Sequence, residues 1–119
     1  MTMRISIFAA VALLTVIAGT AAEAHAFLDH AEPLVGSTVP TAPRELSLFY
    51  TQNLEAAFSS VEVSDADGKR VDLGKPSISG TVMRVGLKPL SPGTYKVRWH
   101  VLSVDTHTTE GSFAFHVGK

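Results

Sequence analysis

Alternation of apolar and polar positions dominates the chain after residue 44. In residues 95–101 every odd position is apolar and every even position is Lys, Arg or His. Because successive side chains of a strand point to opposite faces, this pattern predicts a strand with one buried face. Shorter stretches of the same kind predict strands over residues 46–50, 60–64, 69–73, 81–85 and 112–117, and a first strand around His30.

Turn-forming residues separate these segments. Asp65–Gly68 has the composition of a hairpin turn. Leu90–Tyr95 fits a corner that leads into the long strand, with Tyr95 capping the core. No helical periodicity of useful length competes with the strand pattern. About seven short strands at regular spacing predict an all-β, immunoglobulin-like sandwich.

The first 24 residues have the pattern of a cleaved signal peptide. Arg4 precedes an apolar run over residues 5–17, and residues 22–24, Ala-Glu-Ala, have the small-any-small form of a cleavage site. The run is short for a membrane span, which needs about 20 apolar residues. An uncleaved N-terminal anchor is the alternative. We therefore expect a signal peptide, 1–24, and a secreted periplasmic domain, 25–119.

Composition and charge narrow the function classes. The chain has 10 Lys and Arg against 11 Asp and Glu, a net charge of −1, and this balance argues against nucleic-acid binding. It has no cysteine, which excludes disulfides, a thiolate metal site, a catalytic thiol and a lipid-modified N-terminal cysteine. Secretion without disulfides favours a bacterial periplasmic or extracellular protein over a small eukaryotic secreted domain. We expect one small domain and a monomer.

Three residues suggest a metal site. Cleavage after residue 24 makes His25 the first residue of the mature protein, where its α-amine and ring nitrogen can hold one ion. Asp105 and His107 add a carboxylate and a second imidazole. Two positions apart, they would project to the same side of an extended segment beyond the long strand. Such N and O donors suit Cu(II). A turn aspartate and an ordinary loop histidine are the alternative explanation of that pair.

The remaining histidines are expected at the surface. His100 and His116 occupy polar positions of predicted strands, where side chains usually face solvent. His30 lies five residues after His25, which directs it to the opposite face of an extended chain. Cu(I) prefers thiolate or thioether ligands, and Met83 is the one methionine after residue 24, so a dedicated Cu(I) site is not expected.

The mature chain resembles the CopC family of periplasmic copper-resistance proteins over essentially its whole length. Order, spacing and the N-terminal histidine agree, and the most specific match runs from Pro92 to Trp99 and on through Asp105 and His107. The matching segments are residues 25–26, 32–33, 36–37, 46–54, 57–59, 92–99, 103–107 and 111–115.

This resemblance implies a seven-stranded Greek-key β-sandwich, described as cupredoxin-like or immunoglobulin-like. It also implies one high-affinity Cu(II) ion per mature chain, held by the amine and imidazole of His25, by Asp105 and by His107. Some members add a Glu ligand near the end of the second strand, where this sequence has Gln52. Some carry a Met-rich Cu(I) loop, which is missing here. The family often works beside CopD, a membrane protein that imports copper, so the resemblance implies such a partner.

We compare three candidate functions. The leading hypothesis is a non-enzymatic carrier that sequesters or delivers Cu(II) for copper resistance and homeostasis. A copper redox enzyme with an N-terminal histidine would need an open metal position and a broad aromatic face, whereas Trp99, the only Trp, lies on the apolar side of its strand. A metal-free, immunoglobulin-like interaction module would leave the placement of the three candidate ligands to chance.

Overall fold

The computed structural model describes residues 25–119, and the predicted signal peptide lies outside the described residues. Within this range the chain forms short strands and one turn of 3-10 helix. The elements are β1 (Leu28–Glu32), β2 (Thr38–Val39), β3 (Glu45–Tyr50), η3 (Ala56–Phe58), β4 (Ser60–Ser64), β5 (Ser77–Ser79), β6 (Val82–Gly86), β7 (Gly93–Leu102) and β8 (Thr108–Val117). Residues 25–119 contain no helix with the length and apolar character needed to span a bilayer.

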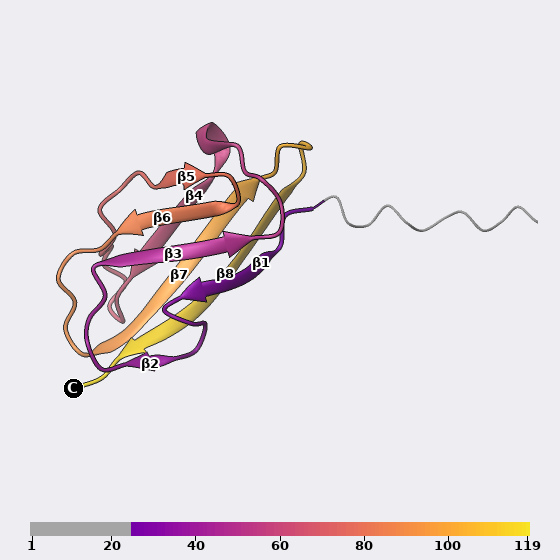
Figure 1. Ribbon diagram of the computed structural model, residues 1–119. Coiled ribbons are helices and arrows are strands. Elements are labelled where there is room, and N and C mark those ends of the chain that lie inside the picture. The colour runs from indigo at the N-terminus through magenta and orange to yellow at the C-terminus, as the bar shows by residue number, and fades with distance from the viewer. Residues whose placement is uncertain (1–24) are drawn as a thin grey trace, which may run out of the picture.

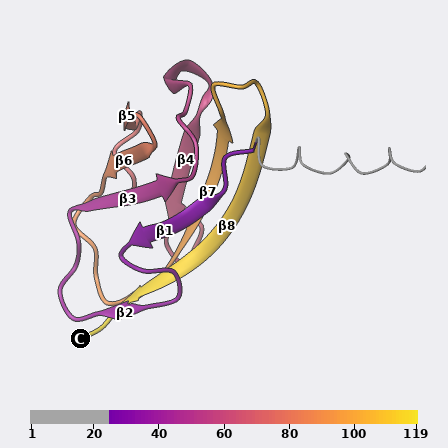
Figure 2. The same ribbon diagram turned by 45° about the vertical axis from the view of Figure 1, so that its right-hand side comes forward.

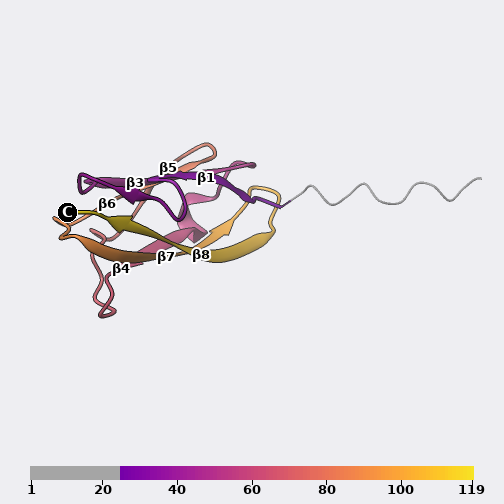
Figure 3. The same ribbon diagram turned by 90° about the horizontal axis from the view of Figure 1, so that it is seen from below.

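The strands form two layers (Figures 1 and 3). One sheet has the order β1-β3-β6-β5 and the other has the order β2-β8-β7-β4. The chain passes repeatedly from one sheet to the other, as in Greek-key sandwiches. The predicted all-β sandwich is therefore confirmed. The strand inventory differs from the expected seven, because the described residues hold eight strands, of which β2 has two residues and β5 has three.

The long hairpin of β7 and β8 organises the second sheet. The two strands pair antiparallel over ten positions, from Gly93 opposite Val117 to Leu102 opposite Thr108. The alternation read from residues 95–101 is confirmed, because positions 96, 98 and 100 are exposed whereas Val97 and Val101 are 0% exposed. These apolar side chains meet those of β3 and β6 between the layers to form the core.

The predicted corner before β7 is also present. The hydroxyl of Tyr95 donates a hydrogen bond of 2.6 Å to the carbonyl of Ser91. The Tyr95 ring stacks on Phe115 with 5.6 Å between centroids, and it is 5% exposed. Tyr95 therefore ties the incoming loop to the core, as expected for a tyrosine at such a corner.

Residues 69–73 do not form the strand that their pattern predicts. Two isolated bridges hold this segment, one between Ser64 and Arg70 and one between Asp72 and Leu87. Ser64 belongs to one sheet and Leu87 directly follows a strand of the other, so the segment passes between the layers. Because each residue pairs with a different sheet, no continuous ladder forms.

Candidate metal centre

The three predicted ligands lie at one end of the sandwich. His25 opens the described chain just before β1, and residues 103–107 form the loop between β7 and β8. Figures 1 and 2 show the chain entering β1 at the end of the sandwich that carries this loop. The rings of His25 and His107 lie 4.5 Å apart between centroids and are within 19° of parallel. The Nδ1 atom of His107 lies 3.5 Å from a carboxylate oxygen of Asp105. The fold thus brings together residues more than 80 positions apart in sequence.

Ser103 organises the loop that carries two of these residues. Its backbone N–H donates to the carbonyl of His107 at 2.9 Å, and its carbonyl accepts from the N–H of Thr106 at 2.9 Å. Its hydroxyl donates to the carboxylate of Asp105. Ser103 itself is completely buried, so the donor side of its side-chain bonds is shielded from solvent. Hydrogen bonds to the buried Ser103 therefore fix the loop, whereas its two candidate ligands face outward.

The conformation of this loop differs from the extended segment expected from the sequence. Thr106 has a φ of 74°, in the left-handed region. Residues 103–107 therefore turn tightly, and Asp105 and His107 approach because the chain reverses rather than because it is extended. The expected proximity of the two side chains is present, although the physical reason for it is different.

The electrostatic setting favours a cation. The hydrogen bond from the hydroxyl of Ser103, together with the imidazole of His107, holds the pKa of Asp105 below its ordinary value and outweighs the opposing effect of desolvation. Asp105 is therefore ionised at neutral pH. The chain segments at this end, residues 25–28, 51–59 and 103–109, contain two acidic residues and no Lys or Arg. Carboxylates without a neighbouring Lys or Arg in these segments favour the approach of a cation.

The side chains alone do not complete a metal site. Within residues 25–119 no group of three His, Cys, Asp or Glu residues is placed to hold an ion. His107 instead makes two separate approaches, to His25 and to Asp105. The remaining predicted donor is the α-amine of His25, which is a peptide nitrogen until residue 24 is removed. The donor set of amine, two imidazoles and one carboxylate fits Cu(II).

The N-terminal arm, residues 25–27, is held firmly beside this loop. The hydroxyl of Thr109 donates to the carbonyl of Ala26 at 2.7 Å. The Oγ1 of Thr51 accepts from the N–H of Phe27 at 3.0 Å. Sequence inspection missed both threonines, because their bonds span 83 and 24 residues and no local pattern indicates them. Gln52 follows Thr51 directly and is partly buried.

The other histidines lie away from the candidate ligands. His30 is exposed, stacks on Phe49 at 4.3 Å and contacts Asp29 at 2.8 Å. The ring nitrogen of His116 lies 2.9 Å from the hydroxyl of Thr94, and its side chain is partly buried. The expectation that these histidines are surface residues is confirmed for His30, whereas His116 is only partly exposed.

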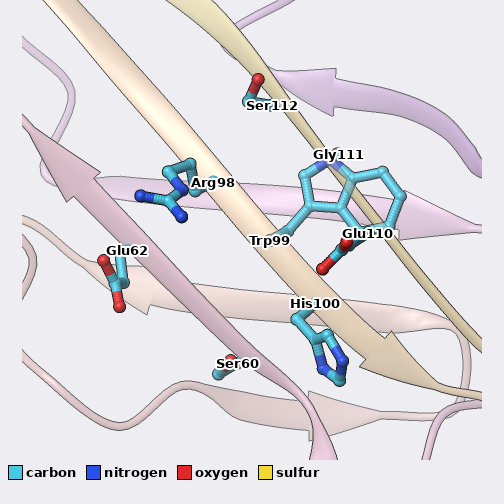
Figure 4. A pocket seen from close by; sticks show the side chains of 8 residues that line it. All are labelled: Ser60, Glu62, Arg98, Trp99, His100, Glu110, Gly111 and Ser112. Atoms are coloured by element: carbon cyan, nitrogen blue, oxygen red, sulfur yellow. The ribbon is translucent and has the colours of Figure 1, made fainter.

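His100 is exposed, as expected, and lines a shallow hollow on the outer face of the β4-β7-β8 sheet (Figure 4). The hollow has a volume of about 320 Å³. Glu110 lies directly opposite His100 in the strand pairing, and Arg98 is two positions along β7. This mixture of charges contains only one histidine and a nearby guanidinium, so it is a poor match to a metal site.

Comparison with known proteins shows which family this chain resembles. The CopC domain matches residues 28–118. The copper resistance protein C of Xanthomonas campestris pv. juglandis is 33% identical over 110 residues, covering 85% of this chain and 86% of that protein. Protein YobA of Escherichia coli strain K12 is 32% identical over 98 residues, covering 79% of each chain.

Solved structures agree with the sequence comparisons. The crystal structure of CopC from Methylosinus trichosporium OB3b superposes with a TM-score of 0.74 at 30% sequence identity. The superposition covers 79% of this chain and 94% of that one. The likeness therefore extends over the two-sheet architecture.

Proposed function

This chain belongs to the CopC family of copper resistance proteins, and we propose that the mature chain binds one Cu(II) ion in the periplasm and carries it as cargo. The ligands are the amine and imidazole of His25, the carboxylate of Asp105 and the imidazole of His107. The observation that carries the proposal is the 4.5 Å approach of the two imidazole rings. Removal of residues 1–24 completes the donor set.

The oxidation state that we propose for the copper follows from the ligand atoms available at this site. Cu(II) favours nitrogen and oxygen ligands, whereas Cu(I) prefers sulfur. Met83 is 0% exposed and packs in the core, so its thioether is not available to an ion at the end of the sandwich. The copper cargo is therefore Cu(II).

A carrier role fits the exposure of the site better than catalysis. CopC-family proteins bind or transport copper and are generally not enzymes. Trp99 is partly buried and packs edge-on against Tyr50, with 5.3 Å between ring centroids. It therefore does not offer the open aromatic face that a polysaccharide-cleaving copper enzyme needs. Its packing supports cargo binding over oxidative chemistry.

We also propose that the protein delivers its copper to a CopD-type membrane importer. The His107 side chain is 48% exposed and that of Asp105 is 35% exposed, so a partner surface can reach the ion directly. Removal of copper by such a partner needs no opening of the sandwich. The end of the molecule that holds the ligands is then the end that docks.

The decisive experiment compares two forms of one chain in Cu(II) competition titrations. One form begins at His25, and the other carries a flexible Gly/Ser extension before His25. The extension is long, because a short one would place its own amine within chelating distance of the ring. The mature form is expected to bind one Cu(II). The extended form should bind more weakly by more than the 10–100-fold that loss of a supporting contact costs.

Ligand variants complete the test. His107→Ala in the mature form should lose affinity to a similar extent, whereas His116→Ala, which removes a histidine from the opposite end of β8, should not. Intact mass of the secreted protein should begin at His25. Equal Cu(II) affinity in the mature, extended and His107→Ala forms would contradict the proposed site.

A further inference from the structure

We propose that Thr51 and Thr109 are positioning residues for copper: they clamp the arm, residues 25–27, so that the new N-terminus lies beside His107 before the ion arrives. This inference rests on the proposed Cu(II) site and names the groups that set its geometry. Neither threonine is a ligand, and each acts through the backbone of the arm.

Thr109 ties the arm to the strand that follows the ligand loop. Its hydroxyl donates a 2.7 Å hydrogen bond to the carbonyl of Ala26, the residue next to His25. Thr109 lies two positions after His107 and pairs with Val101 in β7, which is 0% exposed. The anchor is therefore set in the rigid hairpin that also carries His107. A single bond thus links the two halves of the copper site.

Thr51 ties the same arm to the other sheet. Its Oγ1 accepts from the N–H of Phe27 at 3.0 Å, and its own N–H donates to the carbonyl of Phe27 at 3.0 Å. The same Oγ1 lies 3.5 Å from the carbonyl of His25. Thr51 directly follows β3, so the arm is held from both layers of the sandwich at once. Figure 2 shows β1 entering between the ends of β3 and β8.

Burial of Ala26 further restricts the movement of the arm. Its side chain is 0% exposed and belongs to the core cluster, so the arm cannot slide along the sandwich without exposing the core. Only His25 precedes this anchored residue, and consecutive Cα atoms are about 3.8 Å apart. The amine is therefore confined to the neighbourhood of His107. Ligands held in place before binding lose less conformational freedom when the ion arrives, which increases affinity.

The test uses mature chains that begin at His25. Thr109→Val and Thr51→Val remove each hydroxyl while keeping the branched shape. Thr109→Ser keeps the hydroxyl. Thr108→Val is the matched control, because Thr108 is the exposed neighbour in β8 and its hydroxyl has no hydrogen-bond partner among residues 25–119. Cu(II) affinity is measured by competition, the ligand set by electron paramagnetic resonance, and folding by melting of the metal-free chains.

Loss of an outer contact typically weakens metal binding 10–100-fold. We therefore expect each valine variant to lose about tenfold in Cu(II) affinity and to show an altered nitrogen hyperfine pattern. Thr109→Ser should restore both, and Thr108→Val should change neither. The metal-free melting temperatures show whether any variant has lost its fold, and Thr51→Val carries the test if Thr109→Val does not fold.

Two failures are distinguishable. If the unmutated mature chain binds Cu(II) no better than the chain with the Gly/Ser extension, the amine-based site itself is wrong. If the mature chain binds through its amine but both valine variants match Thr108→Val in affinity and spectrum, the positioning role is wrong. A variant that only melts earlier, with an unchanged copper spectrum, would also overturn the inference, because it assigns the threonine to stability alone.

Discussion

Arg70 donates two hydrogen bonds of 2.8 Å to the carboxylate of Asp72, whose side chain is only 1% exposed. The same carboxylate accepts from the backbone N–H of Val63 at 2.8 Å and from that of Gly74 at 3.2 Å. These side-chain bonds add to the isolated backbone hydrogen bonds that residues 69–73 make to the two sheets. Asp72 fastens the segment that crosses between the sheets.

This carboxylate predicts a specific acid sensitivity. Burial alone would raise the pKa of Asp72, but hydrogen bonds from Arg70 and Val63 outweigh burial and lower that pKa from 3.8 to about 2. A carboxyl with a depressed pKa stabilises the fold above its unfolded pKa, and the contribution is lost as pH falls through the folded value. We expect about 2 kcal/mol of stability to disappear between about pH 4 and pH 2.

Asp72→Asn tests this prediction by urea unfolding at neutral and acidic pH. The variant should be less stable than the unmutated chain by about 2 kcal/mol at neutral pH, and the difference should shrink near pH 2. Asp67→Asn is the control, since Asp67 is an exposed carboxylate in the neighbouring turn. A difference that stays constant with pH would assign the loss to packing rather than to ionisation.

Gly111 leaves room for the ring of Trp99. A Cβ atom at position 111 would lie 2.6 Å from Cζ2 and 2.9 Å from Cε2 of Trp99. Gly111→Ala should therefore force the indole to move and lower the free energy of unfolding by about 1–3 kcal/mol. Tryptophan fluorescence should report the displaced ring. Gly118→Ala is the control, because its Cβ atom would meet nothing closer than 3.4 Å. Equal stability of both variants would show that Trp99 yields freely.

Tyr50 carries a hydroxyl that the fold does not use. Its oxygen is buried and has no hydrogen-bond partner among residues 25–119, and burial raises the pKa of this phenol. Tyr50→Phe keeps the ring against Trp99 and removes the unsatisfied group. We expect thermal unfolding to show unchanged or higher stability, by up to about 1 kcal/mol.

Tyr95→Phe is the matched comparison, because that variant loses the 2.6 Å bond to Ser91. It should be destabilised by about 1 kcal/mol. If Tyr50→Phe costs as much as Tyr95→Phe, the Tyr50 hydroxyl has a stabilising partner after all.

Thr106 occupies a strained backbone position between the two candidate ligands of the loop. Its φ of 74° is unfavourable for a β-branched residue, whereas asparagine tolerates this region. Thr106→Asn should raise the free energy of unfolding by about 1 kcal/mol. Chemical denaturation of the metal-free chain measures the change, with Thr108→Asn, in the regular strand β8, as control. A destabilised Thr106→Asn variant would show that the threonine side chain compensates for its backbone.

Copper should stabilise the mature chain selectively. A ligand that binds only the folded state at 1,000 times its Kd adds about 4 kcal/mol, so the melting temperature should rise with Cu(II) concentration. The form with the Gly/Ser extension should show a smaller rise at the same concentration. Calorimetric melts of both forms, with and without Cu(II), make the comparison. A similar rise in both would indicate binding that ignores the amine.

Local features of the chain were predictable where local forces decide the outcome. The strand at residues 95–101 follows from alternation alone, because pairing and burial there act on every second side chain. The turn at Asp65–Gly68 is equally local: Asp65 accepts hydrogen bonds from the backbone N–H groups of Asp67 and Lys69, both at 2.9 Å. Gly68 has the positive φ of 86° that such a turn needs.

The sequence by itself determined the two-sheet class, the long strand at residues 95–101 and, through family resemblance, the choice of His25, Asp105 and His107 as candidate ligands. It did not predict that residues 69–73 cross between layers, because an alternating pattern looks the same whether a segment pairs with one sheet or with two. Only the tertiary structure brought His25 beside His107. That approach depends on bonds from Thr51 and Thr109 to an arm far away in sequence, and no local pattern records a contact made by chain crossing.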